Sequence, residues 1–236
     1  MKFIPIKERG VVTLEPETYG KSVSGIPLEV WMPSAEVEFL IFAGIHGQEP
    51  ESTLLLAKAL RALAEPSPNC AVILAANPDG LLRGTRANIR GVDLNRNFPA
   101  KNWSETPVKD YWVKREAKEV DLKTGGSPGS EPETQALISL IEKINPQHVI
   151  TIHGPLGCID DPEMSEIGKW MEKRTGLELI PDIGYPVPGS FGSWAKEREL
   201  HVITYELPTE SIWDMFEKHL PVFEDLLVYG KKALDR

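Results

Sequence analysis

Four residues that can bind a metal ion or carry a proton lie at the ends of apolar segments of the chain. His46 comes shortly after one such segment, and Glu49 follows three residues later, where a helix is expected to start. His153 and Glu206 each end a further apolar segment. Two imidazoles and one carboxylate can hold Zn²⁺ with a fourth position open to water, and a carboxylate outside the ligand set can accept a proton from that water.

The spacing of these residues suggests how they could meet. Residues three apart, such as His46 and Glu49 at the entry to a helix, can converge on one ion. The third ligand must then come from elsewhere in the chain, and the end of a neighbouring strand, as at His153, is a natural donor. The alternative is structural: a carboxylate at a helix start, a hydrogen-bonded histidine, and strand-end residues that meet water. The joint occurrence of all four at strand ends favours a metal site.

A second polar cluster occupies residues 86–99. It holds three arginines and three asparagines in a chain that is otherwise acidic. Because the arginine fork binds carboxylates in a bidentate manner, the cluster suggests a substrate with an anionic end. The alternative is a solvated loop whose polar side chains cap short helices.

The elements that must position these residues follow from hydrophobic patterning. A hairpin is expected over 22–32, turning near Ser24 and Gly25, and residues 81–129 are expected to form loops and short elements. Buried strands are predicted at 37–43, 71–76, 149–153 and 202–206. Helices are predicted at 50–64, 130–145, 164–176 and 212–233. The second should begin with a capping box formed by Ser130 and Glu133, and the last should have a break at Pro221.

The alternation of strands with helices predicts an α/β fold. We expect a single catalytic domain over residues 1–236, with a mixed, mostly parallel twisted sheet flanked by helices. In such sheets ligand sites gather at the carboxyl ends of the strands, where the four residues above are found.

Composition restricts the classes of function. The chain has 236 residues, a formal net charge of -9 and 41% hydrophobic residues. This content is sufficient for a buried core, and the acidic balance argues against a nucleic-acid or anionic membrane partner. Two cysteines make no disulfide framework, Pro5 interrupts any signal-like start, and no apolar run approaches the roughly 18 residues of a membrane span. We therefore expect a cytoplasmic protein.

The ordered set of motifs resembles the zinc carboxypeptidases. The set comprises His46-x-x-Glu49, the Asn-Pro-Asp-Gly run at 77–80, the Gly-Val-Asp-Leu-Asn-Arg-Asn-Phe run at 91–98, His153 and Glu206. The segments 94–103, 128–137 and 188–194 look most like the bacterial murein tripeptide amidases of that family.

The resemblance implies a role for each matching residue. His46, Glu49 and His153 would be the ligands of one zinc ion per chain. Glu206 would be the general base and later the proton donor.

The resemblance also implies roles around this set. Asp93 would orient the ring of His46, and Arg86 would polarise the scissile carbonyl and stabilise the oxyanion. Asn95 and Arg96 would hold the free carboxylate of the substrate. Tyr185 and Phe191 lie near the family's mobile tyrosine and the floor of its specificity pocket.

The closer resemblance implies a substrate. It points to the γ-D-glutamyl–meso-diaminopimelate bond of the murein tripeptide L-Ala-γ-D-Glu-meso-diaminopimelate, which is cleaved during cell-wall peptide recycling. Diaminopimelate carries a second ammonium on its side chain, and Asp160 and Asp161 are candidates to bind it. Asp161 could instead cap the helix that holds Met164.

Two other functions remain open at this point. An N-acyl amino acid deacylase, similar to aspartoacylase or the desuccinylases, shares the His-x-x-Glu and the later histidine. A binding module of the same fold could have lost catalysis, although all four metal-site residues are present. A serine hydrolase is disfavoured because the sequence has no Gly-x-Ser-x-Gly elbow.

Overall fold

A six-stranded sheet forms the centre of the computed structural model, which describes residues 3–111 and 119–236. Its strands lie in the order β4-β3-β7-β10-β8-β9. They span β3 (Phe39–Ala43), β4 (Cys70–Ile73), β7 (His148–His153), β8 (Cys158–Asp160), β9 (Glu178–Ile180) and β10 (His201–Glu206). All neighbours are parallel except β10 and β8, so the predicted mixed, mostly parallel sheet is confirmed.

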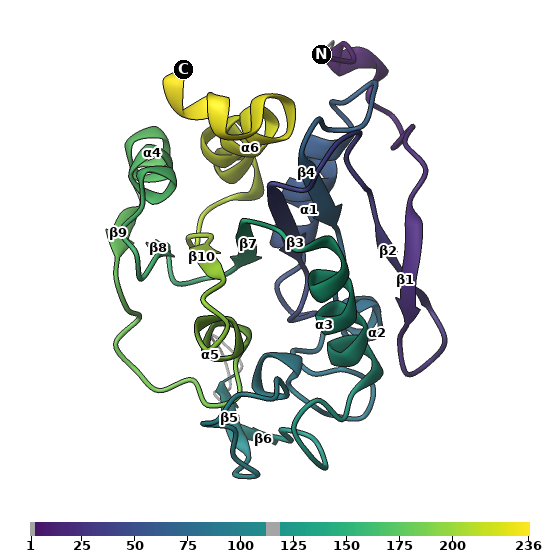
Figure 1. The fold of residues 1–236 in the computed structure, drawn as a ribbon, viewed down its shortest axis with the longest axis vertical. Helices are drawn as coiled ribbons and strands as arrows, with labels where there is room; N and C mark the ends of the chain where they lie inside the picture. The colour runs from purple at the N-terminus through teal and green to yellow at the C-terminus, as the bar shows by residue number, and fades with distance from the viewer. Residues whose placement is uncertain (1–2, 112–118) are drawn as a thin grey trace.

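Helices cover both faces of this sheet. The α-helices of the described residues are α1 (Pro50–Leu60), α2 (Pro78–Arg83), α3 (Pro132–Ile144), α4 (Glu166–Thr175), α5 (Phe191–Lys196) and α6 (Ile212–Tyr229). The buried side chains of α1, α4 and α6 pack with Ile41 and Ile150 on one face. Those of α3 and α5 pack with Leu40 and Phe42 on the other, which explains why β3 is apolar along its whole length. Figure 1 shows α6 beside α4, and α3 beside the N-terminal hairpin.

Two hairpins and three short 3₁₀ helices complete the described part of the chain. The hairpins pair β1 (Glu17–Lys21) with β2 (Pro27–Val30) and β5 (Val108–Tyr111) with β6 (Glu119–Leu122). The 3₁₀ helices are η1 (Ile6–Glu8), η2 (Leu94–Arg96) and η3 (Gly230–Asp235). The first hairpin turns through Gly25 at a φ of 87°, where it was predicted to turn. The expected loops and short elements between 81 and 129 are found as well, with 112–118 outside the described residues.

Two local predictions are wrong. The helix α6 continues through Pro221 because this residue is exposed, as is Glu217 one turn earlier, so water can solvate the carbonyl that loses its partner. The capping box at the start of α3 does not form. Glu131 is the N-cap residue, and the carboxylate of Glu133 instead accepts a hydrogen bond from the backbone N–H of Val23.

Among the residues that the structure describes, no helix combines the length and apolar character needed to cross a bilayer.

Candidate metal and active site

The carboxyl ends of three neighbouring strands place the candidate residues at one edge of the sheet. His153 and Glu206 are the last residues of β7 and β10 and are paired in register. His46 lies in the turn that follows β3, and Glu49 directly precedes α1, whose first residue is Pro50. Proline is favoured at the first helical position because its missing N–H has no helical partner there. Pro50 therefore favours the start of α1 directly after the turn that carries His46 and Glu49.

His46, Glu49 and His153 converge on a common point. Nδ1 of His46 lies 2.8 Å from Oε1 of Glu49, and Nδ1 of His153 lies 3.2 Å from Oε2 of Glu49. The two Nδ1 atoms are 3.2 Å apart. One donor atom from each residue lies within 4.8 Å of the others, and all three residues are buried.

This donor set fits a zinc ion. Two imidazole nitrogens and a carboxylate are ligands that Zn²⁺ prefers, and three protein ligands leave a position open for water or substrate. Burial alone would raise the pKa of Glu49, but the two imidazoles hold it well below its usual value, so the carboxylate is available as an anion.

Asp93 joins the candidate ligand His46 to Arg86. Its Oδ1 lies 3.4 Å from Nε2 of His46 and accepts a hydrogen bond from the backbone N–H of Asn95. Its Oδ2 accepts a hydrogen bond of 2.8 Å from Nε of Arg86. The residue is fully buried, and although burial opposes ionisation, the charges of Arg86 and His46 hold the pKa of Asp93 well below its usual value. A carboxylate on the second ring nitrogen of a ligand histidine fixes its tautomer and orientation.

Glu206 stands beside the ligand set but is outside it. Its Oε2 accepts a hydrogen bond of 3.4 Å from the backbone N–H of Leu156, and 8% of the residue is exposed. Burial and the nearby charge of Glu49 raise the pKa of Glu206, while His153 opposes the shift. A carboxyl group with a raised pKa that faces a cavity is suited to accept and return a proton.

One cavity of about 190 Å³ collects most of the candidate residues. Eight of the nine predicted site residues line it, and the ninth, Asp93, contacts two of them. The eight are His46, Glu49, Arg86, Asn95, Arg96, His153, Tyr185 and Glu206. The structure therefore brings the whole predicted set together, while the role of each residue stays a prediction.

The short helix η2 supplies Asn95 and Arg96 to this cavity. Oδ1 of Asn95 accepts a hydrogen bond from the backbone N–H of Phe191 at the start of α5, and Nη1 of Arg96 donates to the backbone carbonyl of Asn95. The next residue, Asn97, is fully buried, and its side-chain amide donates to the carbonyl of Thr124 and accepts from the N–H of Glu131. Hydrogen bonds to α5 and to the segment 124–131 therefore fix the position of residues 95–97.

A second cavity of about 330 Å³ adjoins the same ligands. It shares Glu49, His153, Gly154 and Pro155 with the first, and continues along Leu207 and α6. The two cavities therefore meet at the candidate metal ligands Glu49 and His153.

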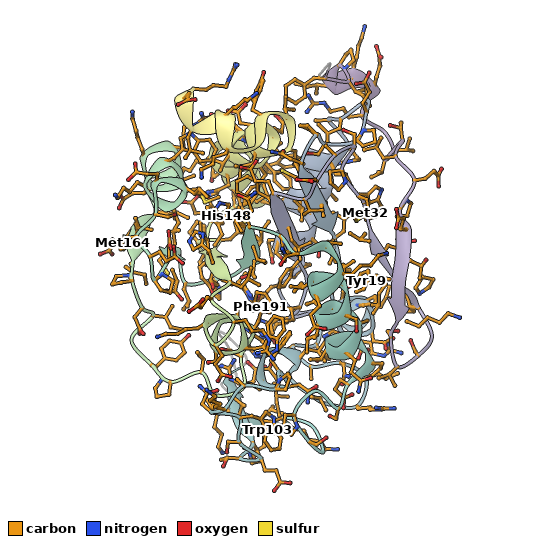
Figure 2. All side chains as sticks on the ribbon, viewed as in Figure 1. Tyr19, Met32, Trp103, His148, Met164 and Phe191 are labelled. Atoms are coloured by element: carbon orange, nitrogen blue, oxygen red, sulfur yellow. The ribbon has the colours of Figure 1, made fainter. Side chains whose placement is uncertain are left out.

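Phe191 does not form the floor of the first cavity. The residue is 2% exposed, and its ring packs in the core against Phe42 and Phe98. Figure 2 shows Phe191 in the interior of the molecule, near α5. Its neighbours Ser190 and Gly192 line the cavity instead. Phe191 shares the buried face of α5 with Trp194 and Ala195, three and four residues later, so its side chain points into the core.

The sequence analysis missed Thr204 as a cavity residue. Thr204 lies two residues before Glu206 on β10 and lines the same cavity. Residues two apart on a strand project to the same face, so strand periodicity could have identified it.

The fold and the site define the class of protein as an α/β metallohydrolase. A family model described as zinc carboxypeptidase matches residues 11–156. The chain is 45% identical over 232 residues to murein peptide amidase A of Escherichia coli K12. This alignment covers 97% of this chain and 96% of that protein. It is 44% identical to the murein peptide amidase A of Vibrio campbellii, over 96% of this chain and 93% of that protein.

A solved structure agrees with these relatives. The crystal structure of the murein-tripeptide amidase from Escherichia coli O157 matches with a TM-score of 0.90 at 44% sequence identity, over 97% of this chain and 98% of that chain. The chain belongs to the zinc carboxypeptidase family and is a hydrolase of the metallopeptidase type.

Proposed function

We propose that the chain is a zinc-dependent amidase that hydrolyses the γ-D-glutamyl–meso-diaminopimelate bond of murein tripeptide, in cell-wall peptide recycling. The observation that carries this proposal is the position of Glu206. It is an unligated carboxyl group beside three converging metal-ligand side chains, in a cavity that also holds Arg86 and Arg96. The names of the relatives, which the chain covers almost completely, support a murein peptide as the substrate.

His46, Glu49 and His153 would hold the zinc ion. When bound, the ion supplies Lewis acidity, which lowers the pKa of water from ~16 to nearer 7 and polarises a carbonyl. Glu206 would accept the proton of the attacking water as the new C–O bond forms at the amide carbon. When the C–N bond breaks, Glu206 would return this proton to the leaving amine.

Arg86 and the Asn95–Arg96 pair would act on the substrate. Arg86 has its Nε committed to Asp93, so its terminal nitrogens would donate to the carbonyl oxygen as negative charge develops there. Burial alone would lower the pKa of Arg86, but the carboxylates of Asp93 and Glu49 raise it, so the guanidinium stays charged. Arg96 and Asn95 would bind the carboxylate of the leaving amino acid. Tyr185, half exposed at the rim of the cavity, would cover it.

The two cavities support a substrate divided at the metal ligands. The leaving amino acid would occupy the cavity lined by Arg96 and Tyr185. The L-alanyl-D-glutamyl part would extend into the cavity along Leu207 and Met215. One catalytic domain over residues 1–236 and a cytoplasmic location also stay predictions.

Product analysis tests the proposal. Purified protein loaded with one equivalent of Zn²⁺ is incubated with the tripeptide, and mass spectrometry should detect free diaminopimelate and L-Ala-D-Glu. A chelator should abolish this release, and added zinc should restore it. N-acetyl-aspartate and N-succinyl amino acids in parallel reactions test the deacylase alternative. A loaded protein that leaves the tripeptide intact overturns the proposed substrate, and one that hydrolyses none of these compounds favours the binding module.

A further inference from the structure

Two adjacent aspartates at the end of β8 have opposite surroundings. Asp161 is fully buried, and its carboxylate is already used within the protein. Its Oδ1 accepts from Nε2 of His201 at 3.0 Å, and its Oδ2 accepts from the hydroxyl of Ser165 at 2.7 Å. Asp161 therefore fixes the start of α4 and has no capacity left for a ligand.

Asp160 lies on the same face of the sheet as the candidate general base. It is the last residue of β8 and the register partner of Thr204 on the antiparallel strand β10. Side chains paired in this way project to one face, as do Thr204 and Glu206, which are two residues apart. All three line the first cavity.

The carboxyl group of Asp160 has an unused acceptor. Its Oδ1 is shielded from solvent, and within the described residues it has no hydrogen-bond partner. No cationic side chain from 3–111 or 119–236 forms an ion pair with it. A buried polar atom without a partner is costly, so a donor from a ligand would relieve that cost.

The charges around Asp160 favour a cation. Burial, Asp182 and Glu206 raise the pKa of Asp160 to about 6, which reflects a negative environment on this side of the cavity. Arg96 lines the same cavity from η2 and is assigned to the carboxylate of the leaving amino acid. A leaving amino acid held by Arg96 could therefore direct a positively charged side-chain group to Asp160.

We propose that Asp160 determines specificity by binding an ammonium group on the side chain of the leaving amino acid, an inference that rests on the proposed amidase function. The occupant is a charged amine three or more bonds beyond the α-carbon, as in diaminopimelate. Asp160 would be a substrate-binding residue with no part in proton transfer at the amide.

The test compares two substrates that differ only in this amine. One is the tripeptide with diaminopimelate, and the other carries 2-aminopimelate, which keeps both carboxyl groups and lacks the side-chain amine. We expect the wild-type protein to prefer the diaminopimelate substrate in kcat/KM by about 10- to 100-fold, as for one charge-assisted hydrogen bond. In Asp160→Asn this preference should fall to near one, mainly through KM.

Two further variants control the measurement. Asp182→Asn removes a nearby negative charge at an exposed position outside the cavity lining, and should keep the wild-type preference. Asp160→Glu keeps the charge and should retain a clear preference for the amine. Thermal melting by circular dichroism verifies that each variant folds. Unchanged preference in folded Asp160→Asn overturns the assignment, as would an equal loss in Asp182→Asn.

Calorimetric titration separates this inference from the proposed function. Free diaminopimelate and 2-aminopimelate are titrated into zinc-loaded wild-type protein and into Asp160→Asn. Tighter binding of diaminopimelate to the wild type alone supports the assignment even if no amide is hydrolysed. Equal binding of the two compounds to the wild type contradicts it. Tripeptide hydrolysis that persists with an unaltered preference in Asp160→Asn leaves the amidase proposal standing and refutes the role of Asp160.

Discussion

His153 and Glu206 are register partners at the ends of the parallel strands β7 and β10. Neighbouring strands lie about 4.8 Å apart, so the sheet itself sets the distance between a candidate metal ligand and the candidate general base. The two side chains then take different partners. His153 faces Glu49 and His46, whereas Glu206 accepts from the backbone of Leu156. The pairing of the two strands thus sets the spacing of the candidate metal ligand and the candidate base, while the segments after β3 and β7 supply their other partners.

Glu206→Gln should bind zinc normally and lose most turnover. The amide is nearly isosteric with the carboxylate but cannot accept the proton, and a general base typically contributes 10²- to 10⁴-fold to the rate. Metal content by atomic emission and tripeptide hydrolysis by mass spectrometry give the two readouts.

The matched control for this variant is Glu178→Gln. Glu178 is an exposed glutamate at the start of β9, so the same chemical change should leave both zinc content and turnover unaltered. If Glu206→Gln hydrolyses the tripeptide at the wild-type rate, another group takes the proton.

Asp93→Asn should weaken zinc binding. The neutral amide cannot hold both Nε2 of His46 and Nε of Arg86 as the carboxylate does, and outer partners of ligand histidines are typically worth 10- to 100-fold in metal affinity. Competition with a chromogenic chelator measures the affinity. Asp79→Asn is the control, because Asp79 is equally buried but accepts from Ser24 away from the ligands. Equal zinc affinities in the two variants would show that Asp93 does not support His46.

Gly47→Ala should disturb the turn that carries the candidate ligands His46 and Glu49. Gly47 lies between His46 and Gln48, and a Cβ placed on it would collide with the backbone of Gly80 and Leu81 in α2. Because backbone cannot move aside as a flexible side chain can, we expect a loss of about 1–3 kcal/mol in stability together with weaker zinc binding. Gly126→Ala provides the control, since a Cβ there has no neighbour within 4 Å. Equal denaturation midpoints for the two variants would contradict the close approach.

The stability of the protein should fall in mild acid because of His219. This residue is fully buried, with Nδ1 2.6 Å from the hydroxyl of Tyr205, and burial lowers its pKa to about 4. The unfolded value is about 6.5, so the unfolded chain binds the proton first. The contribution of neutral His219 is therefore complete above pH 6.5 and decreases as the pH falls toward 4, by about 3 kcal/mol in all.

Urea denaturation from pH 7.5 to 4.5 measures this effect. The free energy of unfolding should decline less steeply with falling pH in His219→Asn than in the wild type, whatever the absolute stability of the variant. Lys173→Asn, at an exposed position on α4, removes a lysine that does not act on His219 and should keep the wild-type slope. Parallel curves for wild type and His219→Asn would mean that His219 does not titrate differently in the two states.

The sequence predicted the parts of the structure with strong local signals. The strands that became β3, β4, β7 and β10 are short apolar runs, and their ends carry the polar residues that meet at the site. The parallel order of these strands follows from the helices between them. The ordered family motifs then identified the residues that line the cavity.

Other features depended on contacts that no local pattern reveals. The strands β8 and β9 are three residues long, too short for periodicity, and the antiparallel β8 is what places Asp160 opposite Thr204. Asp160 and Asp161 are chemically identical in sequence, and only tertiary partners separate them. The break expected at Pro221 fails for a similar reason, because solvent exposure of that side of α6 decides the outcome.

Asn97 has a consequence for how the chain can vary. Its buried amide binds the carbonyl of Thr124, so the polypeptide that departs after Asn97 returns to the same point 27 residues later. A loop whose two ends are joined by hydrogen bonds can be lengthened, shortened or replaced at a modest cost in closure entropy. Changes in residues 104–122 should consequently leave Asn95 and Arg96 in place. This loop is therefore a suitable position for inserting new sequence into the domain.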